Sequence, residues 1–333
     1  MSTTPTSLSM ASRPRRILDF LAHYLFWLLA PVLLLVLALV EPRIASSRNL
    51  LNLVTQTSYL AVFASAQMLV ILIRGFDLSL GSTVSLISVL TALAMTTGLA
   101  EAGLPTFWLI AAGVGVGLLA GASVGVFNGF CTAILRVNPF IVTLGSLGIA
   151  FGVASMASGG RPVFDLPEAF SEALYSGQVL GLSAPVWIAL VLCLVLQLML
   201  SRTVFGRSLY LIGSNPRAAE VAGVPVARYV FITYVLASVV VAIGAMMLTG
   251  RTSSGEPNLG GSLLLPSIAA AVVGGVSLQG GTGGVGNAVM GALFISVLSN
   301  GMNLIEVDGY LQDVILGLVI LVALYLDRFR KYR

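Results

Sequence analysis

The stretch from Ser201 to Tyr229 reads SRTVFGRSLYLIGSNPRAAEVAGVPVARY. It is polar, carries four arginines, and lies between two apolar runs that are each long enough to cross a bilayer. Asn215 is a favoured helix N-cap residue, and Pro216 suits the first helical position. The pattern predicts a two-turn helix over Pro216–Ala222 that Gly223 ends. So short a helix is marginal in water, so we expect it to dock against a partner.

The composition indicates a polytopic membrane protein. Hydrophobic residues make up 57% of the 333 residues and charged residues only 9%, and the mean hydropathy is +1.01. In a soluble domain, about a quarter of the residues are charged. The sequence pI is about 9.3, but the positive charge is scattered in loop-sized clusters, so we expect no nucleic-acid partner.

Ten apolar runs predict ten membrane-spanning helices. They are Phe20–Val40, Leu51–Ile73, Ser82–Gly98, Phe107–Leu135, Pro139–Ser158, Pro185–Leu200, Val230–Gly250, Ser262–Leu278, Val285–Ile305 and Gly309–Leu326. The third and eighth are the weakest, and the fourth is long enough to hide a break. The predicted fold is therefore all-α: a disordered cytoplasmic tail over residues 1–16, followed by a single transmembrane domain over residues 17–333 embedded in the lipid bilayer.

The arginines predict the topology. With ten spans and both termini in the cytoplasm, 13 of the 17 basic residues lie inside and four lie outside, in agreement with the positive-inside rule. This arrangement makes 202–228 a cytoplasmic loop and 159–184 a long periplasmic loop. That outer loop carries the acids Asp165, Glu168 and Glu172, which are either solvated or part of a docking surface.

Glycines recur at every fourth residue of the fourth run, at Gly113, Gly117, Gly121, Gly125 and Gly129. Steps of four residues keep them on one slowly winding face of a helix. Such a face allows a neighbouring helix to approach closely, as in GxxxG packing. Lining of a moving pore is the alternative.

Several absences limit the function. No charge lies in the middle of a span, which argues against a proton-coupled carrier. The single lysine, Lys331, is the third residue from the end, so the chain has no P-loop. One histidine and acids at span ends supply neither a catalytic constellation nor a metal site. We therefore expect no enzyme, and any ATP must be bound by another subunit.

Short motifs then resemble the ribose-type ABC transporter permeases. The segment RGFDLSLGS at Arg74–Ser82 is similar to their GGIDLSVGS, and its matching residues include Gly75, Asp77, Ser79, Gly81 and Ser82. NPFIVTLG from Asn138 resembles PPFIATLG, and SGGRP from Ser158 resembles TGGRPI. Further matches extend in order to about residue 326.

The resemblance implies a permease subunit of the bacterial inner membrane that works by alternating access. Its implied partners are cytoplasmic ATPase subunits, which use ATP and Mg²⁺, a periplasmic sugar-binding protein, and a second permease copy or a sister permease. The chain itself binds no cofactor. The short cytoplasmic helix would be the coupling helix that contacts the ATPase. Its implied residues are Gly213, Asn215, Pro216, Arg217, Ala218, Ala219, Glu220, Ala222 and Gly223.

Two departures from the family pattern concern the cargo. Arg74 replaces the first glycine of GGID, and Leu264, Pro266 and Ser267 stand where the family commonly has an acidic ELDAIAA. Uncharged polar residues within the spans are the candidates for a sugar pathway, because a sugar needs hydrogen-bonding partners. They are Gln56, Gln67, Asn128, Thr143, Ser146, Asn300 and Asn303. For each of them, helix-to-helix hydrogen bonding is the alternative. A stand-alone secondary sugar carrier or facilitator remains the alternative function.

Overall fold

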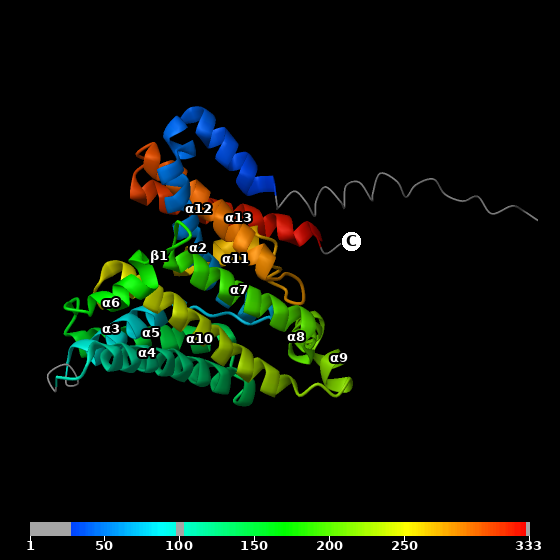
Figure 1. The fold of residues 1–333 in the computed structure, drawn as a ribbon. Helices are drawn as coiled ribbons and strands as arrows, with labels where there is room; N and C mark the ends of the chain where they lie inside the picture. Colours follow the sequence, from blue (N-terminus) through cyan, green and yellow to red (C-terminus); the bar gives the residue numbers. More distant parts are fainter. Residues whose placement is uncertain (1–27, 98–102, 331–333) are drawn as a thin grey trace, which may run out of the picture.

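The computed structural model describes residues 28–97 and 103–330, and these are mostly helical (Figure 1). In chain order the elements are the helix Leu28–Val40, η2 (Pro42–Ala45), α2 (Ser47–Leu72), α3 (Leu80–Thr96), α4 (Thr106–Gly129), η3 (Phe130–Ile134), α5 (Pro139–Ser158), α6 (Glu168–Ser171), η4 (Glu172–Ser176), β1 (Gln178–Val179), β2 (Leu182–Ser183), α7 (Ala184–Arg202), α8 (Val204–Ser214), α9 (Pro216–Val221), α10 (Val226–Thr252), α11 (Leu264–Val273), α12 (Val285–Leu304) and α13 (Gly309–Arg330). The predicted tail over residues 1–16 lies outside the described residues.

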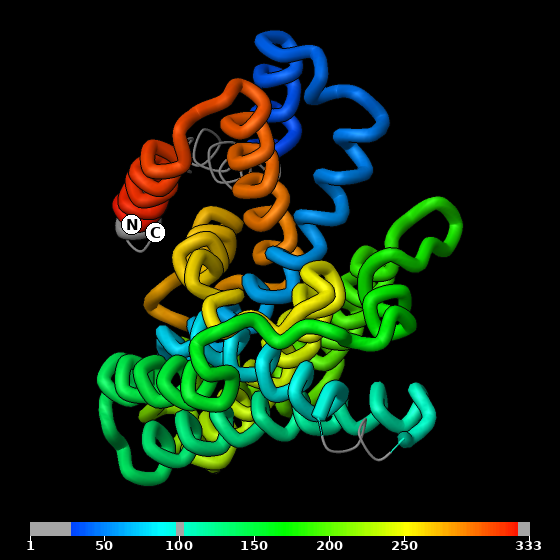
Figure 2. The backbone as a smooth tube through the Cα atoms, turned by 90° about the vertical axis from the view of Figure 1, so that its left-hand side faces the viewer, coloured from blue at the N-terminus to red at the C-terminus, as the bar shows by residue number. Residues whose placement is uncertain are grey.

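The helices form two groups. One contains α3, α4, α5 and α10, and the other contains α2, α7, α11, α12 and α13. Figure 1 shows the first group along the lower edge, and Figure 2 shows the red and orange C-terminal helices set apart from it. Helix α2 packs against both α10 and α12, so it joins the two groups. Its second half is consequently buried, with every residue from Ala61 to Leu72 in the core.

Six helices are long and apolar enough to cross a membrane: α2, α4 together with η3, α5, α7, α10 and α12. Four shorter apolar helices are Leu28–Val40, α3, α11 and the segment Gly309–Tyr325 of α13. The all-α polytopic fold is confirmed. Each of the ten apolar runs contains a helix, but within residues 28–97 and 103–330 only six helices are long and apolar enough to span a membrane, so the count of ten crossings stays a prediction.

The predicted span Ser262–Leu278 contains a helix much shorter than the run itself. Helix α11 has only ten residues, and at 1.5 Å per residue it is about 15 Å long, half the thickness of a bilayer core. Turns precede it from Ser253 to Leu263, and the glycine-rich segment from Gly274 to Gly284 follows it. Glycines end the helix where composition alone predicted its continuation.

The glycine face of α4 packs against other helices. A methyl group on Gly121 would lie 2.8 Å from Ala242 Cβ, and one on Gly125 would lie 2.7 Å from Val235 Cα. Both contacts belong to α10, and the face therefore serves close packing. The long fourth run contains no break after Gly129: its helix continues there as a π-helical turn, η3.

The segment 202–228 is not a loop throughout. Residues Val204–Ser214 form α8, whose buried residues include Leu209 and Ile212. The predicted loop thus contains an amphipathic helix that packs against α7. The predicted two-turn helix follows as α9, with Asn215 as N-cap and Pro216 at its start. Gly223 comes two residues after α9 with φ +82°, a conformation that favours glycine.

Candidate functional site

A buried break separates α2 from α3. The chain leaves α2 at Leu72, passes through Arg74 to Ser79 without regular structure, and enters α3 at Leu80. Gly75 lies so close to its neighbours that a methyl group there would be 2.7 Å from Tyr234 Oη. Tyr234 donates its hydroxyl to Phe76 O at 3.1 Å. Tyr234 of α10 therefore fixes the position of the break, and the absence of a side chain at Gly75 leaves room for its hydroxyl group.

The side chain of Asp77 lies at the centre of this break and is 4% exposed. Its Oδ1 accepts hydrogen bonds from Ser79 N at 2.9 Å and from Ser79 Oγ at 2.6 Å. Asn128 of α4 donates Nδ2 to Ser79 Oγ at 3.0 Å, and Gln67 of α2 donates Nε2 to Asp77 O at 2.8 Å. An acid that sequence placed at the end of a span is thus fully enclosed by protein.

One polar atom of this network lacks a partner. Asn128 is fully buried, yet its Oδ1 accepts no hydrogen bond. A buried acceptor without a donor is costly, since it has lost water and gained nothing. Of the uncharged polar candidates, Asn128 therefore keeps the clearest capacity to bind a further donor group.

The rest of the motif packs α3 against the segment before α11. Backbone atoms of Gly81 and Gly260 lie in direct contact, which leaves no room for a side chain at either residue. Ser85 Oγ accepts from Gly260 N at 3.1 Å, and Ser82 Oγ donates to Ser79 O at 2.9 Å. The glycines and serines of the motif thus bring two chain segments together, while none of them is exposed.

The seven pathway candidates do not gather around one cavity. Gln67 and Asn128 meet at the break, whereas Thr143 and Ser146 donate to carbonyls of their own helix, α5. Gln56 is half-buried on α2. Asn303 accepts from Gln312 Nε2 of α13 at 2.9 Å.

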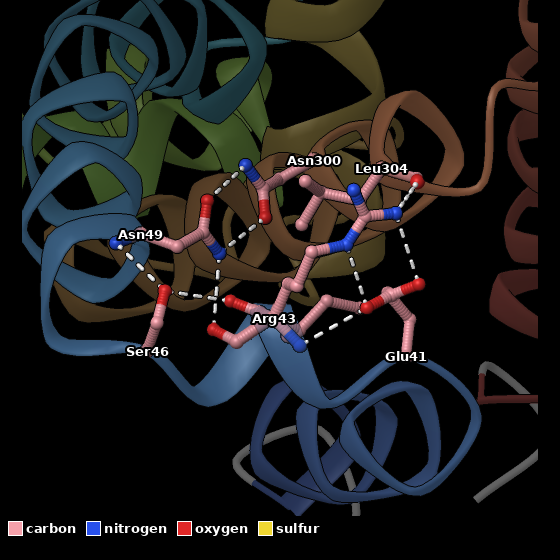
Figure 3. A network of polar contacts seen from close by, with 7 residues as sticks. Glu41, Arg43, Ser46, Asn49, Asn300 and Leu304 are labelled. Atoms are coloured by element: carbon pink, nitrogen blue, oxygen red, sulfur yellow. Dashed lines mark hydrogen bonds and ion pairs between the residues drawn. The ribbon is translucent and has the colours of Figure 1, made fainter.

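Asn300 belongs to a second network, which Figure 3 shows. Asn300 and Asn49 exchange two hydrogen bonds, of 2.9 and 3.0 Å, between α12 and α2. Arg43 donates to Leu304 O at 3.2 Å and pairs with Glu41 at 2.8 Å, which lowers the pKa of the Glu41 carboxyl. These bonds tie η2 to the end of α12. For Asn300 and Asn303, the helix-to-helix alternative describes the observed contacts.

An apolar groove with polar groups lies between α2, α7 and α12 and has a volume of about 780 Å³. None of the seven candidates lines it. Its polar lining includes Gln197, Asn287 and Thr57, and Thr57 Oγ1 has no hydrogen-bond partner. Sequence reasoning missed these residues, although Gln197 and Asn287 also interrupt apolar runs. Among residues 28–97 and 103–330, no group of His, Cys, Asp or Glu could hold a metal ion.

Helix α9 presents an exposed surface. Asn215 accepts from Ala218 N at 3.1 Å and caps the helix, while Ala219 is the one residue of α9 that is buried in the chain. Ala218 and Ala222 are exposed, and Val221 is 91% exposed. A hollow of about 810 Å³ opens beside the end of α9, lined by apolar residues of η3 and α10, by Glu220 and by residues 223–228. Of the other predicted residues of this set, Arg217, Glu220 and Gly223 are exposed as well. Pro216 is half-buried, and Gly213 is buried at the end of α8.

Comparison with known proteins gives one consistent result. A profile of the family described as branched-chain amino acid transport system / permease component matches residues 49–324. A probable ABC transporter permease of Sinorhizobium fredii, y4mJ, is 37% identical over 91% of this chain and 88% of its own length. The ribose import permease RbsC of Haemophilus influenzae is 34% identical over 90% of each chain. The L-arabinose transport system permease AraH of Escherichia coli is 34% identical over 90% of this chain and 88% of its own. No solved structure matches significantly.

Proposed function

The chain belongs to the permease family described as branched-chain amino acid transport system / permease component, and we propose that it imports a sugar. It is the membrane-spanning permease subunit of a binding-protein-dependent ABC importer in the bacterial cytoplasmic membrane. The family description names amino acids, but the relatives named above that carry a cargo in their names carry ribose or arabinose, and they match nine-tenths of this chain. The cargo we propose is a pentose, a hexose or a related polyol.

The observation that carries the coupling part of this proposal is the exposure of α9. An isolated helix of six residues is unstable in water, and this one keeps its apolar Val221 almost fully exposed. Arg217 lies within it and Arg202, Arg207 and Arg228 lie on either side in sequence, and by the positive-inside rule these arginines favour a cytoplasmic position. The proposed contact is a groove on an ATPase subunit that covers Val221, Ala218 and Ala222.

The proposed assembly contains a second permease copy or a sister permease, two ATPase subunits that bind ATP and Mg²⁺, and a periplasmic sugar-binding protein. The binding protein would rest on the loop 159–184, where Asp165, Glu168 and Glu172 are all exposed. Closure of the ATPases would move α9 and open the permease toward the loaded binding protein. Both termini lie in the cytoplasm in this arrangement. Gln67 and Asn128 stay the proposed pathway residues, because both hydrogen-bond to the break beside α3.

The test is co-purification of the ATPase with the wild-type chain and with Val221→Asp. A carboxylate forced into an apolar contact must lose its water, so we expect Val221→Asp to release the ATPase. Leu180→Asp is the matched control, since Leu180 is 87% exposed on the outer β1–β2 turn. It should leave ATPase binding unchanged.

The same preparations, reconstituted in liposomes, test the cargo and the alternative. Uptake of radiolabelled sugar should require ATP and the binding protein and should resist competition by leucine. Equal ATPase binding by wild type and Val221→Asp would contradict the docking role of α9. Uptake without any ATPase would instead establish a stand-alone carrier or facilitator.

A further inference from the structure

Three chain segments that are far apart in sequence meet beside α9. They are the end of α2 at Leu72, the end of α8 at Gly213 and Ser214, and the glycine-rich turn at Gly281. Gly281 N donates to Leu72 O at 2.9 Å. Gly213 contacts both Leu72 O and Gly281 N so closely that no side chain would fit there. The backbones themselves form this junction.

The side chain of Arg74 spans the junction. Its Nε donates to Gly213 O at 2.6 Å, and its Nη2 donates to Ser214 O at 2.5 Å. Both carbonyls lie at the C-terminal end of α8, where a helix has unpaired acceptors and a partial negative charge. Asn215, the N-cap of α9, follows them directly. Arg74 therefore hydrogen-bonds to the two residues that directly precede the N-cap of α9.

The backbone of Arg74 leads to the buried break. Its φ is +63°, which is uncommon for any residue except glycine, and Gly75 and Phe76 follow. The same chain then enters the bonds from Tyr234 to Phe76 O and from Gln67 to Asp77 O. Arg74 thus links the end of α8, which precedes α9, to the break that separates α2 from α3.

We propose that Arg74 is a positioning residue that makes α9 and the break 75–79 move together, so that displacement of α9 reaches the helices around Asp77. This role rests on the proposed coupling function. A planar guanidinium holds its donors at a fixed spacing that suits two adjacent carbonyls, whereas a lysine ammonium acts as a compact point charge on a flexible stem. The chain accepts an unfavourable backbone conformation at this residue and gains two charge-assisted bonds from it.

The experiment compares wild type, Arg74→Gly, Arg74→Lys and Arg207→Ala in liposomes with the ATPase and the loaded binding protein. Glycine adopts φ +63° freely, so Arg74→Gly removes the side chain without straining the break. Arg207 is exposed on α8 and makes no side-chain bond in the described part of the chain, so Arg207→Ala removes an equal charge from the helix that Arg74 contacts. The readouts are ATPase co-purification, kcat and KM of stimulated ATP hydrolysis, and sugar taken up per ATP.

Arg74→Gly should keep the ATPase bound and the KM for loaded binding protein unchanged, while sugar uptake per ATP falls about tenfold. Arg74→Lys should restore part of it, and Arg207→Ala should behave as wild type. Wild-type coupling in Arg74→Gly would overturn the proposal. So would loss of ATPase binding in a folded Arg74→Gly, since Arg74 would then build the docking surface and not transmit its movement. If wild type itself bound no ATPase, the proposed function would fail instead.

Discussion

The break at residues 74–79 and the α8–α9 segment are joined by one arginine, Arg74, but are built in opposite ways. In the break, Asp77 is enclosed, and its carboxylate and carbonyl oxygens accept from Ser79 and Gln67. In α9, Val221 is exposed and touches little of the described chain. The break, whose polar groups are hydrogen-bonded within the chain, should contribute mainly to stability. Helix α9, whose apolar surface is exposed, should contribute mainly to partner binding. Substitutions in the two regions should therefore separate stability from partner binding.

The largest effect is expected from Asp77→Ala. The change leaves the amide and hydroxyl of Ser79 without their common acceptor inside the protein. Buried donors that lose a partner cost about 3 kcal/mol in total. The thermal midpoint of the detergent-purified protein should fall by several degrees, as measured by the fluorescence of its tryptophans, whether or not ATPase is present.

Two controls accompany this variant. Asp77→Asn keeps an oxygen for Ser79 and should lose less stability. Asp313→Ala removes an exposed acid from α13 and should have no effect. A midpoint for Asp77→Ala that equals that of wild type would show that the buried break does not support the fold.

Gly125→Ala tests how much the close packing of α4 against α10, next to the break, contributes to the stability of the fold. Its methyl group would lie 2.7 Å from Val235 Cα and 2.9 Å from Ser238 Cβ, so α4 and α10 would have to separate. Overpacking of this kind costs about 2 kcal/mol. Gly115→Ala is the matched control on the same helix, since no atom lies within 4 Å of that methyl group. If the two variants lowered the thermal midpoint equally, the tight packing of the glycine face would not matter.

The local sequence predicted α9 well, because Asn215, Pro216 and Gly223 act through their own backbone preferences. The same holds for the start of α5, where Asn138 precedes Pro139 and accepts from Phe140 N. The glycine face of α4 followed from its spacing. Such features depend on residues close in sequence, so they could be predicted without the fold.

The rest depended on contacts between distant segments. Asp77 reads as an acid at the end of a span, and only the packing of α4 and α10 around it makes it buried. The Arg74 bonds to α8 join residues about 140 positions apart. The groove between α2, α7 and α12 combines Thr57, Gln197 and Asn287 from three runs. No spacing rule brings such residues together, and the coupling and pathway roles stay predictions.

The smallest effect is expected from a change at the N-cap of α9, and it separates local docking from global stability. Asn215→Ala removes the acceptor for Ala218 N, and loss of an N-cap costs about 1 kcal/mol. Because α9 has few contacts of its own, this cost should appear as fewer folded α9 helices and an ATPase affinity about fivefold lower, with little change in the thermal midpoint. Titration of the ATPase against the reconstituted permease measures it.

Asn138→Ala provides the decisive contrast, since Asn138 caps α5 with the same Asn-Pro pair and a bond of 2.9 Å to Phe140 N. Helix α5 has 20 residues and packs on α3, so the lost cap should lower the thermal midpoint slightly and leave ATPase affinity unchanged. Asn215→Asp, which keeps an acceptor, should bind ATPase as wild type does. If Asn215→Ala and Asn138→Ala weakened ATPase binding to the same degree, the weaker binding would reflect a general loss of stability. The proposed local role of α9 in docking would then be wrong.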